Sequence, residues 1–380
     1  MKLFEYEGIE LFRREGIPVP DYALASSPAE ARKKAQEIGL PVMIKAQVLT
    51  GGRYLAGGVH IAQSLEDVER ATHRILGLSI GGMPVQQVMA VRRVEIAQQF
   101  YLGVTVDEYQ GTPVAILSIE GGVSINKVAQ ERPEALASKR ISIIDGLGSS
   151  EARQMCREVG LRGNELTETA SLLGALYRVF RNYDALVAEI NPLVRTANGE
   201  YLALDAKVEI DNSSLYRHTD LNFSLTDRIT NPLERKGREI GVTYVALDGD
   251  IAIIASGAGL GMASMDIISQ SMRPANFLET GGAITAELLY KVMGLVLQKE
   301  GIKALFINVY GGINPIHEGA KGVVQYMQEH GVTIPVVAKA LGNHQEETWE
   351  IFREHGVHVV TDVSTEKGIE YLARLLEGGA

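Results

Sequence analysis

The second half of the chain alternates between short apolar runs and helical segments, and this rhythm constrains the fold more than any other feature. Five apolar runs recur, and the segments between them have helical periodicity. Such alternation is typical of a parallel sheet with helices on both faces. The runs cover residues 251–255, 276–278, 304–309, 335–340 and 357–360. The sequence therefore predicts a doubly wound α/β domain in this half.

Glycine follows three of these runs directly, in the segments 256–259, 280–282 and 310–312. Ligands of a doubly wound sheet bind at the carboxyl ends of its strands, where these segments would lie. Asn314 is a typical helix cap with Pro315 at the first helical position, so free backbone amides would face the last of these loops. The segment 256–259 departs from the dinucleotide fingerprint and lacks the expected acidic ribose partner, which argues against a nicotinamide-dependent enzyme.

The first half of the chain mixes capped helices with strands and glycine-rich loops. We expect helices over 4–15, from 27 onward, and over 64–76, 150–159 and 164–182, with strands within 41–48, 84–106 and 113–120. The stretch 211–238 is polar and weakly periodic, which is typical of a connection between domains. We therefore predict two domains, residues 1–238 and residues 239–380.

A β-hairpin is predicted over residues 189–207, with 197–199 as a three-residue turn whose glycine can adopt a left-handed conformation. In that register Asn191 lies opposite Asp205, with Cβ atoms about 5 Å apart. Glu189 likewise lies opposite Lys207. An amide oxygen beside a carboxylate suits Mg²⁺, which completes its shell with phosphates and water. An ordinary hairpin with a solvated polar face is the alternative.

A glycine-rich loop follows the predicted strand that carries Lys45. It contains four glycines between residues 51 and 58, with Arg53 among them. Such a loop allows backbone amides to approach an anion closely, although a plain connection between two strands has the same composition. The spacing is not that of a Walker A loop.

Composition excludes several classes of function. The net charge of −10 argues against sequence-independent binding of nucleic acid. No apolar run has the length of a membrane span, and the N-terminus lacks the pattern of a signal peptide. The single cysteine, Cys156, cannot form a disulfide framework or a thiolate metal site. We therefore expect a protein of the reducing cytoplasm that contacts neither nucleic acid nor membrane.

A series of short motifs runs through both halves of the chain. They are E-Y at 5–6, K-A-Q-V at 45–48, G-G-R at 51–53, A-G-G-V at 56–59, Y-L-G at 101–103, E-G-G-V at 120–123, E-I-N-P-L-V at 189–194, L-D-A-K at 204–207, L-Y-R at 215–217, V-A-L-D-G at 245–249, G-A-G-L at 257–260, M-D at 265–266, P-A-N-F-L at 274–278 and G-G-I at 311–313. In this order and spacing the chain resembles the β subunit of succinyl-CoA synthetase from end to end.

The resemblance implies an ATP-grasp nucleotide-binding domain followed by a flavodoxin-like ligase domain with a doubly wound parallel sheet. It also implies a partner α subunit that binds CoA and carries a phosphorylated histidine, in a heterodimer or heterotetramer. In that family ATP or GTP, with Mg²⁺, phosphorylates the histidine. A carboxylic acid then takes the phosphoryl group, and CoA displaces phosphate to give the acyl-CoA.

The resemblance assigns roles by position. It places phosphates on Lys45, Gly51, Gly52 and Arg53, Mg²⁺ on Asn191 and Asp205, and the partner's phosphohistidine against Glu189. Val91 stands at the position that meets the base, and Gln99 at the ribose side. Ser256, Gly311, Gly312 and Ile313 would receive the acid and the phosphoryl group.

The chain departs from the family at several of these positions. Tyr54 and Leu55 replace glycine and lysine in the glycine-rich loop, and Val91 and Gln99 replace acidic residues. Ser124 and Asn126 also replace glutamates, and Phe4 replaces a histidine. Ser256 replaces an asparagine that contacts the acid, which opens space there.

These departures leave alternatives. One is a paralogue that uses another nucleotide or a larger acid such as malate or citrate. Another is a scaffold subunit that has lost nucleotide binding, although the retained Lys45, Glu189, Asn191 and Asp205 argue against it. His317 is interpreted as a surface histidine without an acid–base partner rather than as a catalytic group.

Overall fold

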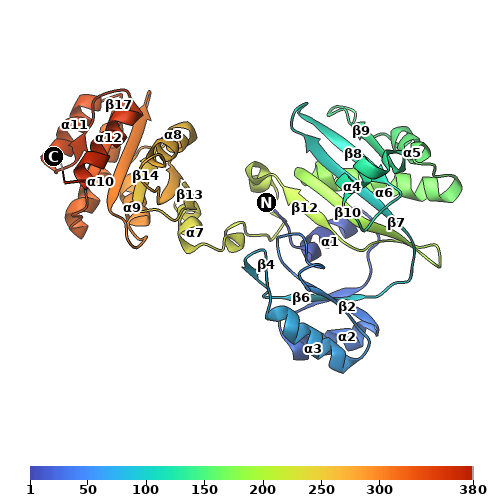
Figure 1. Cartoon of the computed structure of the whole chain (residues 1–380). Helices are drawn as coiled ribbons and strands as arrows, with labels where there is room; N and C mark the ends of the chain where they lie inside the picture. Colours follow the sequence, from blue (N-terminus) through green and yellow to red (C-terminus); the bar gives the residue numbers. More distant parts are fainter. Residues whose placement is uncertain (379–380) are drawn as a thin grey trace. The chain divides into compact units, whose positions relative to one another are not determined.

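The computed structural model describes residues 1–378, and contacts divide the chain into two compact units, Met1–Asn222 and Phe223–Ala380 (Figure 1). The sequence placed the boundary later, at residue 238. Helix α7 (Pro232–Glu239) accounts for this difference, because it packs on strand β13 (Thr243–Ala246) and helix α9 (Ala286–Val296) of the second unit. Among residues 1–378, no helix combines the length and apolarity needed to cross a bilayer.

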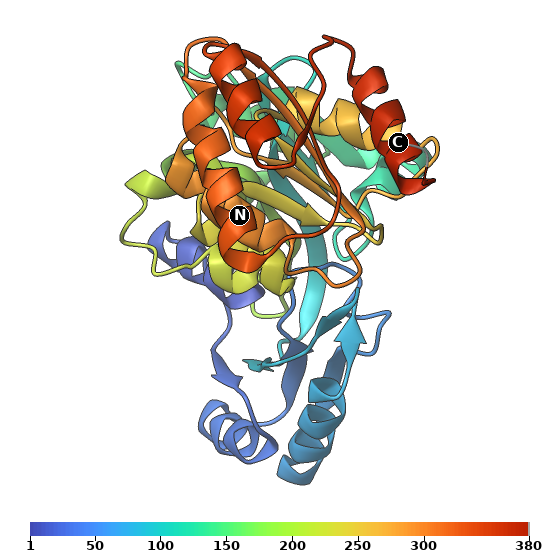
Figure 2. The ribbon, with the colours of Figure 1, turned by 90° about the vertical axis from the view of Figure 1, so that its left-hand side faces the viewer.

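The first unit contains a four-stranded sheet in the order β1-β6-β2-β3, with every pair antiparallel. Helices α2 (Pro28–Ile38) and α3 (Leu65–Leu76) lie side by side against it and are the two blue helices at the bottom of Figure 2. Both begin at a serine whose hydroxyl accepts a backbone hydrogen bond, as the capping pattern predicts. The strands are β1 (Tyr22–Ala25), β2 (Val42–Ala46), β3 (Val59–Ala62) and β6 (Val88–Arg92). Small aliphatic side chains fill the space between sheet and helices.

A six-stranded sheet completes this unit, in the order β11-β10-β7-β8-β9 with β12 also paired to β10. Helices α5 (Ser149–Glu158) and α6 (Gly163–Asn182) pack on it, and α1 (Glu5–Arg14) packs beside β12 and α6. The strands are β7 (Ile96–Asp107), β8 (Thr112–Ser118), β9 (Leu136–Arg140), β10 (Ala185–Thr196), β11 (Tyr201–Ala203) and β12 (Lys207–Ile210). The remaining elements are the short pair β4 (Ser79–Ile80) and β5 (Met83–Pro84), helix α4 (Ile125–Glu131) and a 3₁₀ turn, η1 (Pro133–Ala135). Two further 3₁₀ turns, η2 (Asn212–Arg217) and η3 (Thr226–Arg228), follow β12.

The second unit is built on one sheet in the order β13-β15-β14-β16-β17-β18. The five strands that the apolar runs predict are parallel, which confirms the doubly wound reading. The edge strand β13, which the sequence did not predict, is antiparallel to β15. Without it the order of the parallel strands is 2-1-3-4-5, the flavodoxin-like arrangement. The parallel strands are β14 (Ile251–Ala255), β15 (Asn276–Glu279), β16 (Ala304–Gly311), β17 (Val336–Gly342) and β18 (His358–Val359).

Helices cover both faces of this sheet. Side chains of α9, α10 (Ile316–His330) and α11 (Gln345–Glu354) form one apolar core with the strands. Helices α8 (Ala258–Ile268) and α12 (Thr365–Leu376) form a second core on the other face. The sheet is therefore buried on both sides, which is why its strands read as continuous apolar runs.

Cys156 lies in α5 and is fully buried. Burial raises the pKa of its thiol to about 11. At pH 8 the thiolate, which is the reactive form, is then a very minor species. We expect alkylation by iodoacetamide at pH 8 to be roughly 100-fold slower in the native chain than in urea. Equal rates, measured by mass spectrometry, would mean that the thiol is accessible.

Candidate nucleotide and ligase sites

The predicted hairpin forms in the first unit. Glu189 pairs with Lys207, and Leu193 pairs with Ala203, which is the expected register. The turn closes at Thr196, whose amide donates to Glu200 O at 2.8 Å, and Gly199 has a φ of 85°. The turn prediction is therefore confirmed.

Asn191 lies where the ladder of β10 is irregular, and its side chain binds the loop that follows β8. Its Oδ1 accepts from Gly122 N at 2.7 Å, and its Nδ2 donates to Val123 O at 3.1 Å. A Cβ on Gly122 would lie 2.4 Å from Oε1 of Gln99. Asn191 and Gln99 therefore meet at Gly122, although their positions in the sequence are far apart.

Asp205 belongs to a cluster of charges that joins α1, β2, the glycine-rich loop and the hairpin. Its Oδ1 accepts from Arg53 Nη2 at 2.8 Å. Arg53 also pairs with Glu5, and Glu5 accepts from Lys45 Nζ at 2.8 Å. Lys45 Nζ donates further to Leu204 O at 2.6 Å. The structure thus brings together Lys45, Arg53 and Asp205, three of the residues that the sequence singled out.

Glu5 is the residue of this cluster to which sequence reasoning gave no role. Its side chain is only 1% exposed and holds both cations. Burial would lower the pKa of the Arg53 guanidinium, but the carboxylates of Glu5 and Asp205 outweigh it and raise that pKa. The only signal in the sequence was the E-Y motif at 5–6.

A pocket of about 560 Å³ opens beside Lys45. This volume is in the usual range for small-molecule sites. Its wall consists of Met43, Ile61, Val91, Leu204 and residues 92–96, which run from the end of β6 to the start of β7. Val91, which the resemblance places at the base, lines this pocket. Glu95 also lines it, and sequence reasoning did not identify this acidic group.

The glycine-rich loop carries an unusual pair of exposed apolar side chains, Tyr54 at 78% and Leu55 at 92% exposure. Gly51 and Gly52 before them are exposed as well. Gly51 and Gly52 are therefore accessible to solvent, whereas the amides of residues 56–58 donate hydrogen bonds within the loop.

Glu189 lies on β10 beside Lys207, whose Nζ is 3.3 Å from Glu189 Oε2. Burial and, to a smaller extent, the charge of Glu189 raise the pKa of Tyr101. The Glu189 side chain is 19% exposed.

In the second unit, Ser256 follows β14 and Gly311 ends β16. In the 2-1-3-4-5 order β14 is strand 1 and β16 is strand 3, and the two are neighbours. Their carboxyl ends therefore form the switch point where such folds bind ligands. Ser256 Oγ accepts from Tyr310 N at 2.9 Å and donates to Tyr310 O at 3.2 Å. The predicted residues Ser256, Gly311, Gly312 and Ile313 therefore gather at one edge of the sheet.

Asn314 corrects one expectation. It does not cap α10, which begins at Ile316 after Pro315. Its side-chain amide instead donates to Gly282 O, so that it ties the loop after β15 to the loop after β16. The tertiary contact competes successfully with the local capping motif.

Gly311 is a position where even one methyl group cannot fit. A Cβ there would lie 2.3 Å from Ile316 Cγ2 and 2.8 Å from Asn314 O, whereas a Cβ on Gly312 would meet only Tyr310 at 3.6 Å. If the chain has the acid–CoA ligase activity that the resemblance implies, we expect Gly311→Ala to lower it about 10-fold by displacing this loop. Gly174→Ala on α6 is the control, because a Cβ there would have no heavy atom within 4 Å, apart from its own stretch of helix, among the described residues, and it should keep near-normal activity. Equal effects of the two substitutions in a coupled assay would contradict this.

Two family models match the chain. One described as an ATP-grasp domain covers residues 2–195, and one described as CoA-ligase covers residues 254–369. A solved structure of ATP citrate lyase from Methanothrix soehngenii matches 99% of each chain with a TM-score of 0.80. At 17% identity this likeness shows the fold alone. Fold and family models together define the class, an ATP-grasp domain followed by a CoA-ligase domain.

Curated relatives narrow this class. The β subunit of the GDP-forming succinate–CoA ligase of Thermus thermophilus is 40% identical over 97% of this chain and 98% of its own length. The β subunit of the ADP-forming succinate–CoA ligase of Rubrobacter xylanophilus is 38% identical over 93% of each chain. The chain belongs to the family of succinate–CoA ligase β subunits. Membership of a β-subunit family implies a partner subunit in general.

Proposed function

We propose that this chain is the β subunit of a nucleotide-dependent acid–CoA ligase that uses succinate. The observation that carries the proposal is similarity over nearly the whole chain to β subunits named for that reaction. The ATP-grasp model matches the first unit of the structure, and the CoA-ligase model matches the second. The reaction is phosphorylation of a histidine on the partner α subunit, transfer of the phosphoryl group to the acid, and displacement of phosphate by CoA.

We assign the magnesium nucleotide to the residues at the hairpin and beside the pocket. Asp205 presents a carboxylate that is 37% exposed, next to two cations suited to phosphate. We assign Mg²⁺ to Asp205 and Asn191, and phosphates to Lys45, Arg53 and the amides of Gly51 and Gly52. When bound, Mg²⁺ would neutralise charge on the phosphates. Arg53 would still have Glu5 as a carboxylate partner if Asp205 bound Mg²⁺.

The remaining assignments follow the pocket and the sheet edge. The base would lie against Val91, with Gln99 toward the ribose, and Glu95 supplies a hydrogen-bond acceptor on the pocket wall. Glu189 would position the partner's phosphohistidine. Ser256 and the loop of Gly311, Gly312 and Ile313 would receive the acid and the phosphoryl group.

The alternatives raised by the sequence are not favoured. A scaffold without nucleotide binding would need no cluster of Lys45, Arg53 and Asp205 beside an open pocket. The hypothesis of a malate or citrate enzyme depends on Ser256 alone, and the side chain of Ser256 is hydrogen-bonded to the backbone of Tyr310. The named relatives include both GDP-forming and ADP-forming enzymes, so the assay below uses both ATP and GTP. A cytoplasmic location stays a prediction.

The test is an assay of the purified chain with its α subunit. Acyl-CoA formation is measured with succinate, malate and citrate, each with Mg-ATP and with Mg-GTP. We expect the highest kcat/KM for succinate, and no turnover when either subunit is omitted. A higher kcat/KM for malate or citrate would show that the acid is different. Intact complex formation without histidine phosphorylation by either nucleotide would establish the scaffold function instead.

A further inference from the structure

Two histidines and a glutamate meet in the second unit, at the start of α10 and α11. His317 lies in the first turn of α10, His344 directly precedes α11, and Glu347 is in the first turn of α11. The two imidazole rings have centroids 4.6 Å apart. The ligand-capable atoms of all three residues lie within 4.8 Å of one another.

The single carboxylate of Glu347 contacts both rings. His344 Nδ1 lies 3.1 Å from its Oε2, and His317 Nε2 lies 3.8 Å from its Oε1. In a tetrahedral zinc site, ligand atoms about 2 Å from the metal are about 3.3 Å apart. The separation of His344 Nδ1 from Glu347 Oε2, 3.1 Å, is close to this value, and the ligand atoms of all three residues lie within 4.8 Å of one another.

His317 corrects the sequence interpretation of an exposed histidine without a partner. Its side chain is 13% exposed, and Nε2 lies 3.0 Å from Glu318 Oε1. Its Nδ1 is buried and has no hydrogen-bond partner among residues 1–378. Its Nε2 faces the carboxylates of Glu318 and Glu347, where a metal-binding nitrogen would lie.

His344 is held in an unusual backbone conformation. Its φ is +60°, and among residues 1–378 Asp184 is the other non-glycine residue with positive φ. Thr348 donates from both its amide and its hydroxyl to His344 O, at 3.1 and 2.8 Å. The backbone is thus secured in the arrangement that brings the imidazole to Glu347.

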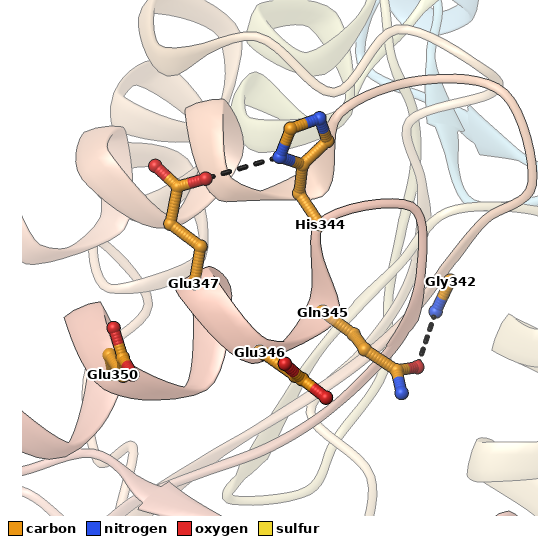
Figure 3. Close-up of a pocket in the computed structure, with 6 residues that line it drawn as sticks. All are labelled: Gly342, His344, Gln345, Glu346, Glu347 and Glu350. Carbon is orange, nitrogen blue, oxygen red and sulfur yellow. Dashed lines mark hydrogen bonds and ion pairs between the residues drawn. The ribbon is translucent and has the colours of Figure 1, made fainter.

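The surroundings are acidic. Glu346, Glu347 and Glu350 line a surface hollow of about 610 Å³ together with His344. Figure 3 shows these side chains, with Glu347 directed at the His344 ring. The positive ends of α10 and α11 oppose a cation here, but these carboxylates offset that potential. Imidazole ligands select zinc and similar transition ions over Mg²⁺, which prefers oxygen.

We propose that His317, His344 and Glu347 form a binding site for a divalent transition-metal ion of the Zn²⁺ class. The ion would link α10 to α11 beside the loop that carries Gly311. The loop between β17 and α11 already contacts the Gly311 loop. Asn343 N donates to Gly311 O at 2.7 Å, and Asn343 Nδ2 donates to Ile313 O at 2.9 Å. The site stabilises this loop pair and is independent of the nucleotide site in the first unit.

The test is calorimetric titration of the untagged full-length chain with ZnCl₂, after treatment with chelator and in the presence of Mg²⁺. We expect about one ion per chain. Because His344 and Glu347 are half-exposed, His344→Ala and Glu347→Gln should fold, and each should weaken binding more than about tenfold. His73→Ala, at an exposed position on α3, is the matched control and should bind normally.

Two further measurements complete the test. Co²⁺ should give the visible absorption of a tetrahedral ion in the wild-type chain and not in His344→Ala. Asp205→Ala should retain zinc binding, which separates this site from the proposed magnesium site. Absence of stoichiometric binding, or equal binding by wild type, His344→Ala and Glu347→Gln, would overturn the proposal and leave the cluster as ion pairs only.

Discussion

Replacement of Asp205 by alanine is expected to slow phosphorylation of the partner subunit by Mg-nucleotide roughly 1,000-fold, equivalent to about 4 kcal/mol of transition-state stabilisation. Phosphoryl transfer depends on positioning and on neutralisation of charge, and Asp205 is the carboxylate of the proposed metal site. Its loss would also leave Arg53 with Glu5 as its only carboxylate partner in the cluster.

The measurement is incorporation of labelled phosphate from the γ-position into the α subunit of the assembled complex. Asp220→Ala is the matched control, because Asp220 is an exposed aspartate of the same unit whose carboxylate pairs with Arg14 on the surface. Calorimetry with Mg-ADP and Mg-GDP should show weakened binding in Asp205→Ala alone. A loss of rate of less than tenfold would remove Asp205 from the metal site.

Replacement of Glu5 by alanine is expected to destabilise the first unit by about 3 kcal/mol. The carboxylate is buried between Lys45 and Arg53, and Lys45 itself is 9% exposed. Removal of Glu5 takes the carboxylate partner from the buried Lys45 and leaves Arg53 with Asp205, and the cost of the buried Lys45 charge exceeds the loss of a surface pair.

Urea unfolding of the first unit, followed by circular dichroism, measures this effect. Glu10→Ala is the matched control on the same helix, because Glu10 pairs with Arg14 at 3.5 Å on the exposed face. That change should cost no more than about 0.5 kcal/mol. Equal midpoints for the two variants would show that the buried pair contributes little to stability.

The hairpin shows how far local rules reach. A turn sequence with glycine in the left-handed position sets the register, and register determines which side chains face each other. Glu189 therefore meets Lys207 as predicted. The roles of Asn191 and Asp205 stay predictions, because opposition across a hairpin does not reveal which third group each side chain binds.

Those third groups come from distant parts of the chain. Lys45 meets Glu5 across 40 positions, and Asp205 meets Arg53 across 152. Asn314 is a second case, because the local sequence predicts a helix cap and the side chain instead donates to a loop 32 positions away. Sequence periodicity carries no information on such pairs.

The sequence by itself determined the doubly wound second half, the hairpin and the family, because apolar alternation, turn residues and motif order are local properties. Only the tertiary structure decided that Glu5 holds the two cations, that Glu95 lines the pocket, and that His317 meets His344 and Glu347. Those contacts depend on how sheets and helices pack, and packing places side chains together whatever their separation along the chain.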